Sequence, residues 1–210
     1  HDEYSCPNMR EQFEEEGYKC DDINLMTSDI PDDASVLVIA APSRDFESAE
    51  IERLDAFSDN GGQMMIIAQQ GKDIPSALSG YMADWGITVN NDYVIETDSN
   101  YIIKSSFGAI QTSVLVENDI TNSLISQKLS YVTPASRSIT VKENNVYHTT
   151  IMPLLESSKK SFARVDLTNK SSEKTDGDTD GPFTVSAIAT KSNENNKSRM
   201  FVLGSLYSVE

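Results

Sequence analysis

The amino-acid sequence predicts an α/β fold in which helices flank a mostly parallel sheet and a β-rich C-terminal part follows. Residues 35–41 and 64–68 are continuous apolar runs, which are typical of strands buried on both faces. A helical pattern follows each run, and this alternation predicts parallel strands joined by right-handed crossovers. From about residue 100 onward the predicted strands are short and rich in Thr and Ser, which indicates the β-rich part.

The N-terminal half alternates helices and strands. Pro7 suits the first turn of a helix and Gly17 its end, and the pair Gly61-Gly62 ends a second helix whose first turn is acidic. In order, we expect a helix at 6–16, partial strand character at 18–25, a turn at 31–33, a strand at 35–41, a helix at 46–60, a strand at 64–68, a helix at 74–85, and extended segments at 87–89 and 93–96.

The C-terminal half contains fewer helices. Residues 168–181 are poor in apolar side chains and rich in Ser, Thr, Asp and Lys, which is typical of a solvated loop. The other expected elements are a helix at 119–126, strands at 146–151, 162–167, 183–190 and 200–203, and an exposed hairpin loop at 191–198. We therefore expect an α/β core over 1–98 and a β-rich extension over 99–210, with strands 183–190 and 199–204 returning to the sheet to give one compact unit.

The chain is strongly acidic. With 17 basic and 33 acidic residues among 210, its net charge is −16. A surface that neutralises phosphates needs an excess of Lys and Arg, so the charge disfavours nucleic-acid binding and docking on anionic membranes. A hydrophobic content of 38% is enough for a core and disfavours a disordered acidic chain.

No apolar run approaches the ~20 residues of a membrane-spanning helix, so we expect any membrane anchor to lie outside these 210 residues. The two cysteines, Cys6 and Cys20, are too few for a disulfide-dense scaffold. The cysteine content leaves open whether these two pair and in which compartment the chain works.

Several segments, in the same order, resemble those of the ABC-transporter auxiliary family, which includes gliding-motility-associated, Gld-type transport proteins. One departure is that Asn118-Asp119 stands where the family has His-Pro. The matching segments are Gly17-Tyr18, 30–42, 50–54 followed by Gly61-Gly62, Leu78 with 85–94, 119–124, 181–189 and 199–205.

This resemblance implies a flavodoxin-like domain related to the class I glutamine-amidotransferase-like fold. It implies the extracytoplasmic soluble region of a bacterial, gliding-motility-like ABC transport component, held at the cell membrane by segments outside this chain. The implied partners are the membrane and ATPase subunits of the transporter. In such proteins a strand and a turn precede the first helix, so we expect the first strand just before residue 1.

Amidotransferase-like folds can carry a Cys nucleophile on a tight turn after a buried strand, with a His as base. Neither predicted buried strand is followed by Cys, and His148 is expected in a polar strand of the second half. Pro42-Ser43-Arg44 lacks the Gly-x-Ser-x-Gly pattern of a hydrolase, and Gln70-Gly71-Lys72 lacks the rest of a Walker motif. We therefore expect a non-enzymatic domain without a cofactor, and nucleotide hydrolysis in a different subunit.

Asp176, Asp178 and Asp180 match the start of a calcium-binding loop. The bidentate Glu of such a loop would stand at Ala187, and Pro182 with a strand replaces the following helix. We expect an acidic solvated loop and no metal site, although the spacing leaves weak calcium binding open.

A cleft remains the best candidate site. In open α/β sheets, the loops beyond the carboxyl ends of the strands meet at one edge and bind ligands there. These loops supply one Arg, a carboxylate and amides, which could orient a small polar ligand, a glycan or a peptide. The simpler alternative is that these side chains cap helices and stabilise turns. The candidate binding residues are His1, Glu3, Ser43, Arg44, Gln69, Gln70 and Ser205.

Three functions follow. The first is a non-enzymatic accessory domain of a bacterial ABC-type transport system that binds a substrate, a cell-wall component or a partner subunit. The second is an amidotransferase-like hydrolase on the same fold, either active or degenerate. The third is a carbohydrate-related binding module.

Overall fold

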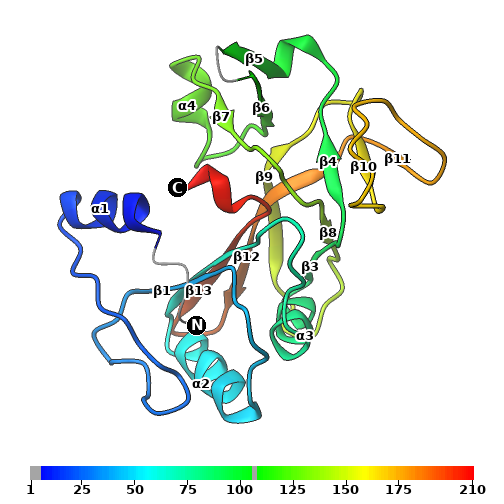
Figure 1. The fold of residues 1–210 in the computed structure, drawn as a ribbon. Coiled ribbons are helices and arrows are strands. Elements are labelled where there is room, and N and C mark those ends of the chain that lie inside the picture. Colours follow the sequence, from blue (N-terminus) through cyan, green and yellow to red (C-terminus); the bar gives the residue numbers. More distant parts are fainter. Residues whose placement is uncertain (1–5, 106–107) are drawn as a thin grey trace.

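The computed structural model describes residues 6–105 and 108–210, which form a large sheet with helices on both faces and a smaller sheet beside it (Figure 1). The helices in this part of the chain are α1 (Pro7–Glu15), α2 (Ser48–Asp59), α3 (Ser76–Asp84) and α4 (Asn122–Ser126). The strands are β1 (Val36–Ala40), β2 (Gln63–Ile67), β3 (Ile87–Val89), β4 (Tyr93–Ile95), β5 (Ile102–Ser105), β6 (Gly108–Leu115), β7 (Tyr131–Val132), β8 (Ile139–Val141), β9 (Thr150–Glu156), β10 (Phe162–Arg164), β11 (Thr179–Asp180), β12 (Thr184–Ser192) and β13 (Lys197–Leu203).

Within the described residues the large sheet has ten strands and is mixed, so the expected flavodoxin-like, mostly parallel sheet is wrong. Its main path is β1-β2-β13-β12-β9-β6-β5, along which the pairings of β1 with β2 and of β2 with β13 are parallel. From β13 to β5 every pairing is antiparallel. β11, β10 and β4 form the separate small sheet.

A short connection accounts for one of these antiparallel pairings. β12 and β13 are joined by a tight turn in which Asn193 N donates to Asn196 O, and strands connected in this way pair antiparallel. β3 follows α3, as a parallel α/β pattern requires, but it pairs antiparallel with β8 instead of extending the parallel strands. The expected hairpin loop at 191–198 is shorter in the structure, because 191–192 and 197–198 belong to the strands and only 193–196 form the turn.

Side chains alternate along the parallel strands and divide the core into two layers. Ile39 and Ile66 belong to the layer that contains Leu54 of α2 and the buried side chains of α3. Ile67 and Leu203 point to the opposite face, which α1 and the C-terminal residues cover. β1 is the edge strand of this path, and its side chains alternate between a buried face and a half-buried face, so the expectation of full burial on both faces holds for one face only. Its first residue, Val36, is 40% exposed.

An aromatic cluster closes the sheet on the α3 side. Trp85 is fully buried, and its ring centroid lies 5.7 Å from that of Tyr147 and 6.3 Å from that of Tyr81. The Lys191 ammonium lies 4.2 Å from the Tyr147 ring centroid and 2.7 Å from an Asp59 carboxylate oxygen. Lys191 therefore links β12 to α2 and to the aromatic rings. Burial of Tyr81 in this cluster raises the pKa of its hydroxyl to about 12.

Candidate functional site

The three parallel strands end side by side at their carboxyl edge. Ala41 N donates to Ile67 O at 2.9 Å, and Ala68 N donates to Leu203 O at 2.9 Å. The loops that follow β1, β2 and β13 therefore leave the sheet at the same edge. These loops carry the predicted site residues Ser43, Arg44, Gln69, Gln70 and Ser205, whereas His1 and Glu3 lie outside the described residues.

The side chains of Arg44 and Ser205 form hydrogen bonds within the protein that hold these loops in place. The Arg44 guanidinium donates to the buried Glu50 carboxylate at 2.7 Å and to Asp45 O at 2.7 Å. Glu50 also accepts from Glu47 N in the capping box that begins α2. Ser205 is fully buried, and its hydroxyl donates to the carbonyl oxygen of Pro134. These contacts match the simpler alternative of caps and turn hydrogen bonds.

Arg137, which the sequence analysis did not single out, joins several loops at this edge. Its side chain is 2% exposed, and it donates to Asn90 O at 2.6 Å and to Lys72 O at 2.5 Å. Its backbone N–H donates to Gly204 O at 2.9 Å. Burial lowers the pKa of Arg137, and nearby Asp73 acts in the opposite direction. The guanidinium is bonded to carbonyl oxygens and is not available for chemistry.

A cavity of about 300 Å³ opens next to this edge. Gln70 from the loop after β2 lines it, whereas Ser43, Arg44, Gln69 and Ser205 do not. The other lining residues are Tyr93, Ile95, Arg164, Leu167, Asn169, Lys170 and Ser171. The cavity thus lies between the carboxyl edge of the parallel strands, the small sheet, and the loop that joins β10 to β11.

The small sheet forms one wall of this cavity. Tyr93 and Ile95 are two residues apart on β4 and therefore point to the same face. In the pairing of β4 with β10, Tyr93 stands opposite Arg164 and Ile95 stands opposite Phe162. The Arg164 guanidinium carbon lies 5.1 Å from the centre of the Phe162 ring. This antiparallel register brings an aromatic, an aliphatic and a cationic side chain together.

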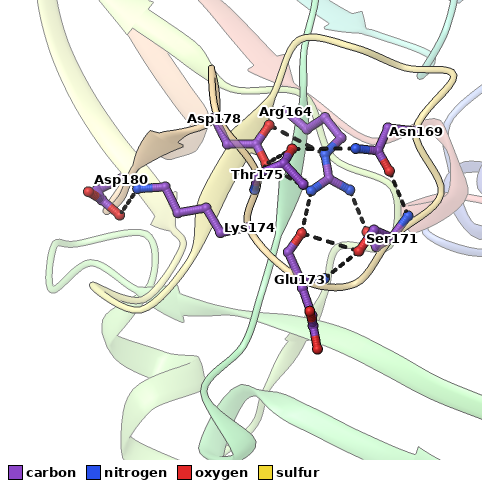
Figure 2. A network of polar contacts seen from close by, with 8 residues as sticks. All are labelled: Arg164, Asn169, Ser171, Glu173, Lys174, Thr175, Asp178 and Asp180. Atoms are coloured by element: carbon purple, nitrogen blue, oxygen red, sulfur yellow. Dashed lines mark hydrogen bonds and ion pairs between the residues drawn. The ribbon is translucent and has the colours of Figure 1, made fainter.

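The loop between β10 and β11 forms the opposite wall and is wrapped around Arg164 (Figure 2). Arg164 is 1% exposed and donates to both Asp178 carboxylate oxygens, at 3.3 and 2.8 Å. It also donates to Glu173 O at 2.7 Å and to Ser171 O. The hydrogen bonds that Asp178 accepts from Arg164 and from Thr175 lower the pKa of this carboxyl group to about 2.

The same loop contains the sequence that resembles a calcium-binding loop. Asp178 is paired with Arg164, and Asp180 is paired with Lys174 at 2.6 Å, so two of the three carboxylates already have cationic partners (Figure 2). Across residues 6–105 and 108–210, no group of three or more His, Cys, Asp or Glu side chains is placed to hold a metal ion.

The residues considered for nucleophilic catalysis are dispersed. Cys6 is buried and unpaired at the start of α1, and Cys20 is also a free thiol. Burial and the negative charge of Glu210 raise the pKa of Cys6, the opposite of what a reactive cysteine needs. His148 precedes β9, at the end of the sheet where β12 turns into β13, and Ser43 is exposed at the other end.

Comparison with known proteins identifies the family. A solved structure described as "mmIFT52 N-terminal domain" has a similar fold, with a TM-score of 0.63 and 17% identity over 97% of this chain and 80% of that one. No curated protein matches the sequence. Among the helices that the structure describes, none is long and apolar enough to cross a membrane. The model of the family described as "ABC-type uncharacterized transport system" matches residues 7–204, which confirms the family resemblance of the sequence segments. The chain therefore belongs to this ABC transport auxiliary family.

Proposed function

We propose that the protein is a non-catalytic auxiliary component of a bacterial, gliding-motility-like ABC transport system. In this proposal it works on the extracytoplasmic side of the cell membrane and binds a ligand or partner at the carboxyl edge of β1, β2 and β13. The family match over residues 7–204 is the observation that carries the transport role. Segments outside this chain would hold the domain at the membrane.

The arrangement of the edge supports a binding role over a hydrolytic one. A nucleophile needs a base within hydrogen-bond reach. At this edge Arg44 is paired with Glu50, and Ser205 donates to a carbonyl oxygen. The cavity beside Gln70 offers amide, hydroxyl, ammonium and apolar groups on one concave surface, as small-molecule sites do.

Purification from native membranes tests the transport role. We expect a tagged chain with its natural flanking segments, cross-linked in the bacterium that produces it, to bring down ABC membrane and ATPase subunits. A tagged unrelated extracytoplasmic domain is the control. Equal recovery of transporter subunits with both baits contradicts the proposed association.

Protease accessibility tests the side of the membrane. We expect a protease added to intact spheroplasts to cleave the domain, with a cytoplasmic marker protein remaining uncut. Cleavage that requires inverted vesicles would reject the extracytoplasmic placement while leaving the association with the transporter standing.

A further inference from the structure

The cavity lining is unlike the rest of the molecule in charge. Acidic residues outnumber basic ones by 33 to 17 in the chain, yet the charged residues that line the cavity are Arg164 and Lys170, both cationic. Arg164 is buried, whereas Lys170 is an exposed side chain on the cavity lining. A lining without carboxylates in so acidic a protein indicates a site that accepts negative charge.

Lys170 supplies the charge that is available to a ligand. The Arg164 guanidinium is neutralised by Asp178, with a shortest distance of 2.8 Å. Lys170 forms no ion pair within the described residues, and its ammonium donates only to Leu167 O at 3.2 Å. The nearby Asp166 carboxylate accepts from the backbone and the hydroxyl of Thr168, so it is turned into its own loop. The Lys170 ammonium is therefore the cationic group on the lining that has no carboxylate partner among the described residues.

Two neutral donors complete the polar side of the cavity. The side chains of Gln70 and Tyr93 line it and have no hydrogen-bond partner in the part of the chain that the structure describes. Burial raises the pKa of Tyr93, so its hydroxyl stays protonated and can donate at neutral pH. Ile95 and Leu167 form an apolar surface next to these donors.

We propose that this cavity binds a small organic carboxylate with an apolar body. The carboxylate would pair with the Lys170 ammonium and accept from the Gln70 amide and the Tyr93 hydroxyl, and the apolar body would lie against Ile95 and Leu167. A volume of about 300 Å³ is at the lower end for ligand sites, which indicates a molecule the size of an acylated amino acid. The proposal rests on the proposed binding function and names its ligand class.

The alternatives fit the lining less well. A phosphate group carries more negative charge and is usually held by a free arginine fork, but the fork of Arg164 already binds Asp178. A neutral sugar carries no anionic group that could pair with the Lys170 ammonium. Both kinds of molecule are therefore included as probes.

NMR titration of the whole chain with four probes tests the proposal. N-acetyl-L-leucine carries the carboxylate, N-acetyl-L-leucinamide replaces it with a neutral amide, and phosphoserine and methyl β-glucoside represent the alternatives. We expect shifts at amides around Gln70, Tyr93 and Lys170 with the acid, and at least about tenfold weaker binding of the amide, because a charge-assisted bond is lost.

Variants locate the binding. Lys170→Glu should weaken binding of the acid at least about tenfold, and Tyr93→Phe, which removes only the hydroxyl, by about threefold. Lys142→Glu makes the same charge change at an exposed lysine outside the cavity and should leave the affinity within about twofold. The amide spectrum of each variant shows whether it is folded.

Equal binding of acid and amide, equal effects of Lys170→Glu and Lys142→Glu, or binding of phosphoserine or the glucoside in preference to the acid would overturn the carboxylate proposal. These results would leave the association with the transporter intact, because membrane purification tests that association separately. Loss of the association with retained carboxylate binding would overturn only the transport role.

Discussion

Replacing Asp178 with Asn tests whether the loop between β10 and β11 is held by its buried ion pair. The Asp178 carboxylate accepts two hydrogen bonds from Arg164 and two from Thr175, from its backbone N–H and its hydroxyl. Asn retains one oxygen acceptor but removes the negative charge, so the guanidinium of Arg164 stays buried without a counterion. Removing one partner of a buried pair costs about 3–5 kcal/mol.

We expect this loop to open without the rest of the chain unfolding, because local segments of a fold can open separately. The cost of the substitution is then limited to the free energy that holds the loop closed. Taking about 3 kcal/mol, the population of the open loop rises on the order of a hundredfold. Native-state hydrogen exchange reports this opening at the hydrogen-bonded amides of Ser171 and Asp178, whose acceptors the substitution leaves in place. We expect these amides to exchange about a hundred times faster in Asp178→Asn, with β12 and β13 unchanged.

Asp180→Asn is the matched control, because Asp180 and Lys174 form an ion pair that is largely exposed. Exposed pairs contribute about 0–1 kcal/mol, so we expect less than about fivefold faster exchange in this variant. The reasoning fails if the two variants behave alike, or if Asp178→Asn exchanges as slowly as the unmodified chain.

The pH dependence of the same amides follows from the pKa of Asp178. Its pKa is lowered from the ordinary 3.8 to about 2 in the folded loop, so its stabilising contribution is fully present above pH ~4 and is lost as the pH falls through about 2. Asp178→Asn removes this titration. A loop whose stability falls equally in both proteins between these pH values would contradict the assignment.

Three further predictions concern close packing, helix stability and thiol reactivity. Gly204→Ala places a Cβ atom in steric overlap with the carbonyl oxygen of Arg137, so we expect about 2 kcal/mol or more of lost stability in urea unfolding. Gly80→Ala lies in an exposed position of α3 with nothing within 4 Å of the new atom, and it should add up to about 1 kcal/mol. Cys6 should react with iodoacetamide more slowly than Cys20, as followed by mass spectrometry, because it is buried and its pKa is raised; faster labelling of Cys6 would contradict the buried placement.

The local elements could be predicted because their signals are local. β1, α2 and β2 follow from two apolar runs and a helix that ends at Gly61, and their parallel pairing agrees with the expected crossover. The position of β13 could not be predicted in this way, because its register with β2 joins Met64 to Met200 across more than half of the chain. Residues 18–25 have a strand-like pattern, but they form no strand, and most of their side chains are exposed.

The candidate site was predicted in part. The sequence places Gln70 in the loop after the carboxyl end of β2, and this residue lines the cavity. Lys170 and Tyr93 were missed because their meeting depends on the small sheet, whose strands are far apart in sequence. Arg164 and Arg137 look like surface residues in the sequence, since only the tertiary structure shows that Asp178 and backbone carbonyls surround them.

The aromatic cluster beside α3 has a spectroscopic consequence. Trp85 is the only tryptophan in the chain, it is fully buried, and the Lys191 ammonium lies 5.6 Å from its ring. Its fluorescence therefore reports on the junction of α3 and β12, and none of the residues in this cluster lines the cavity. We therefore expect the Trp85 fluorescence to stay unchanged when the loop around Arg164 opens and to change when the whole chain unfolds.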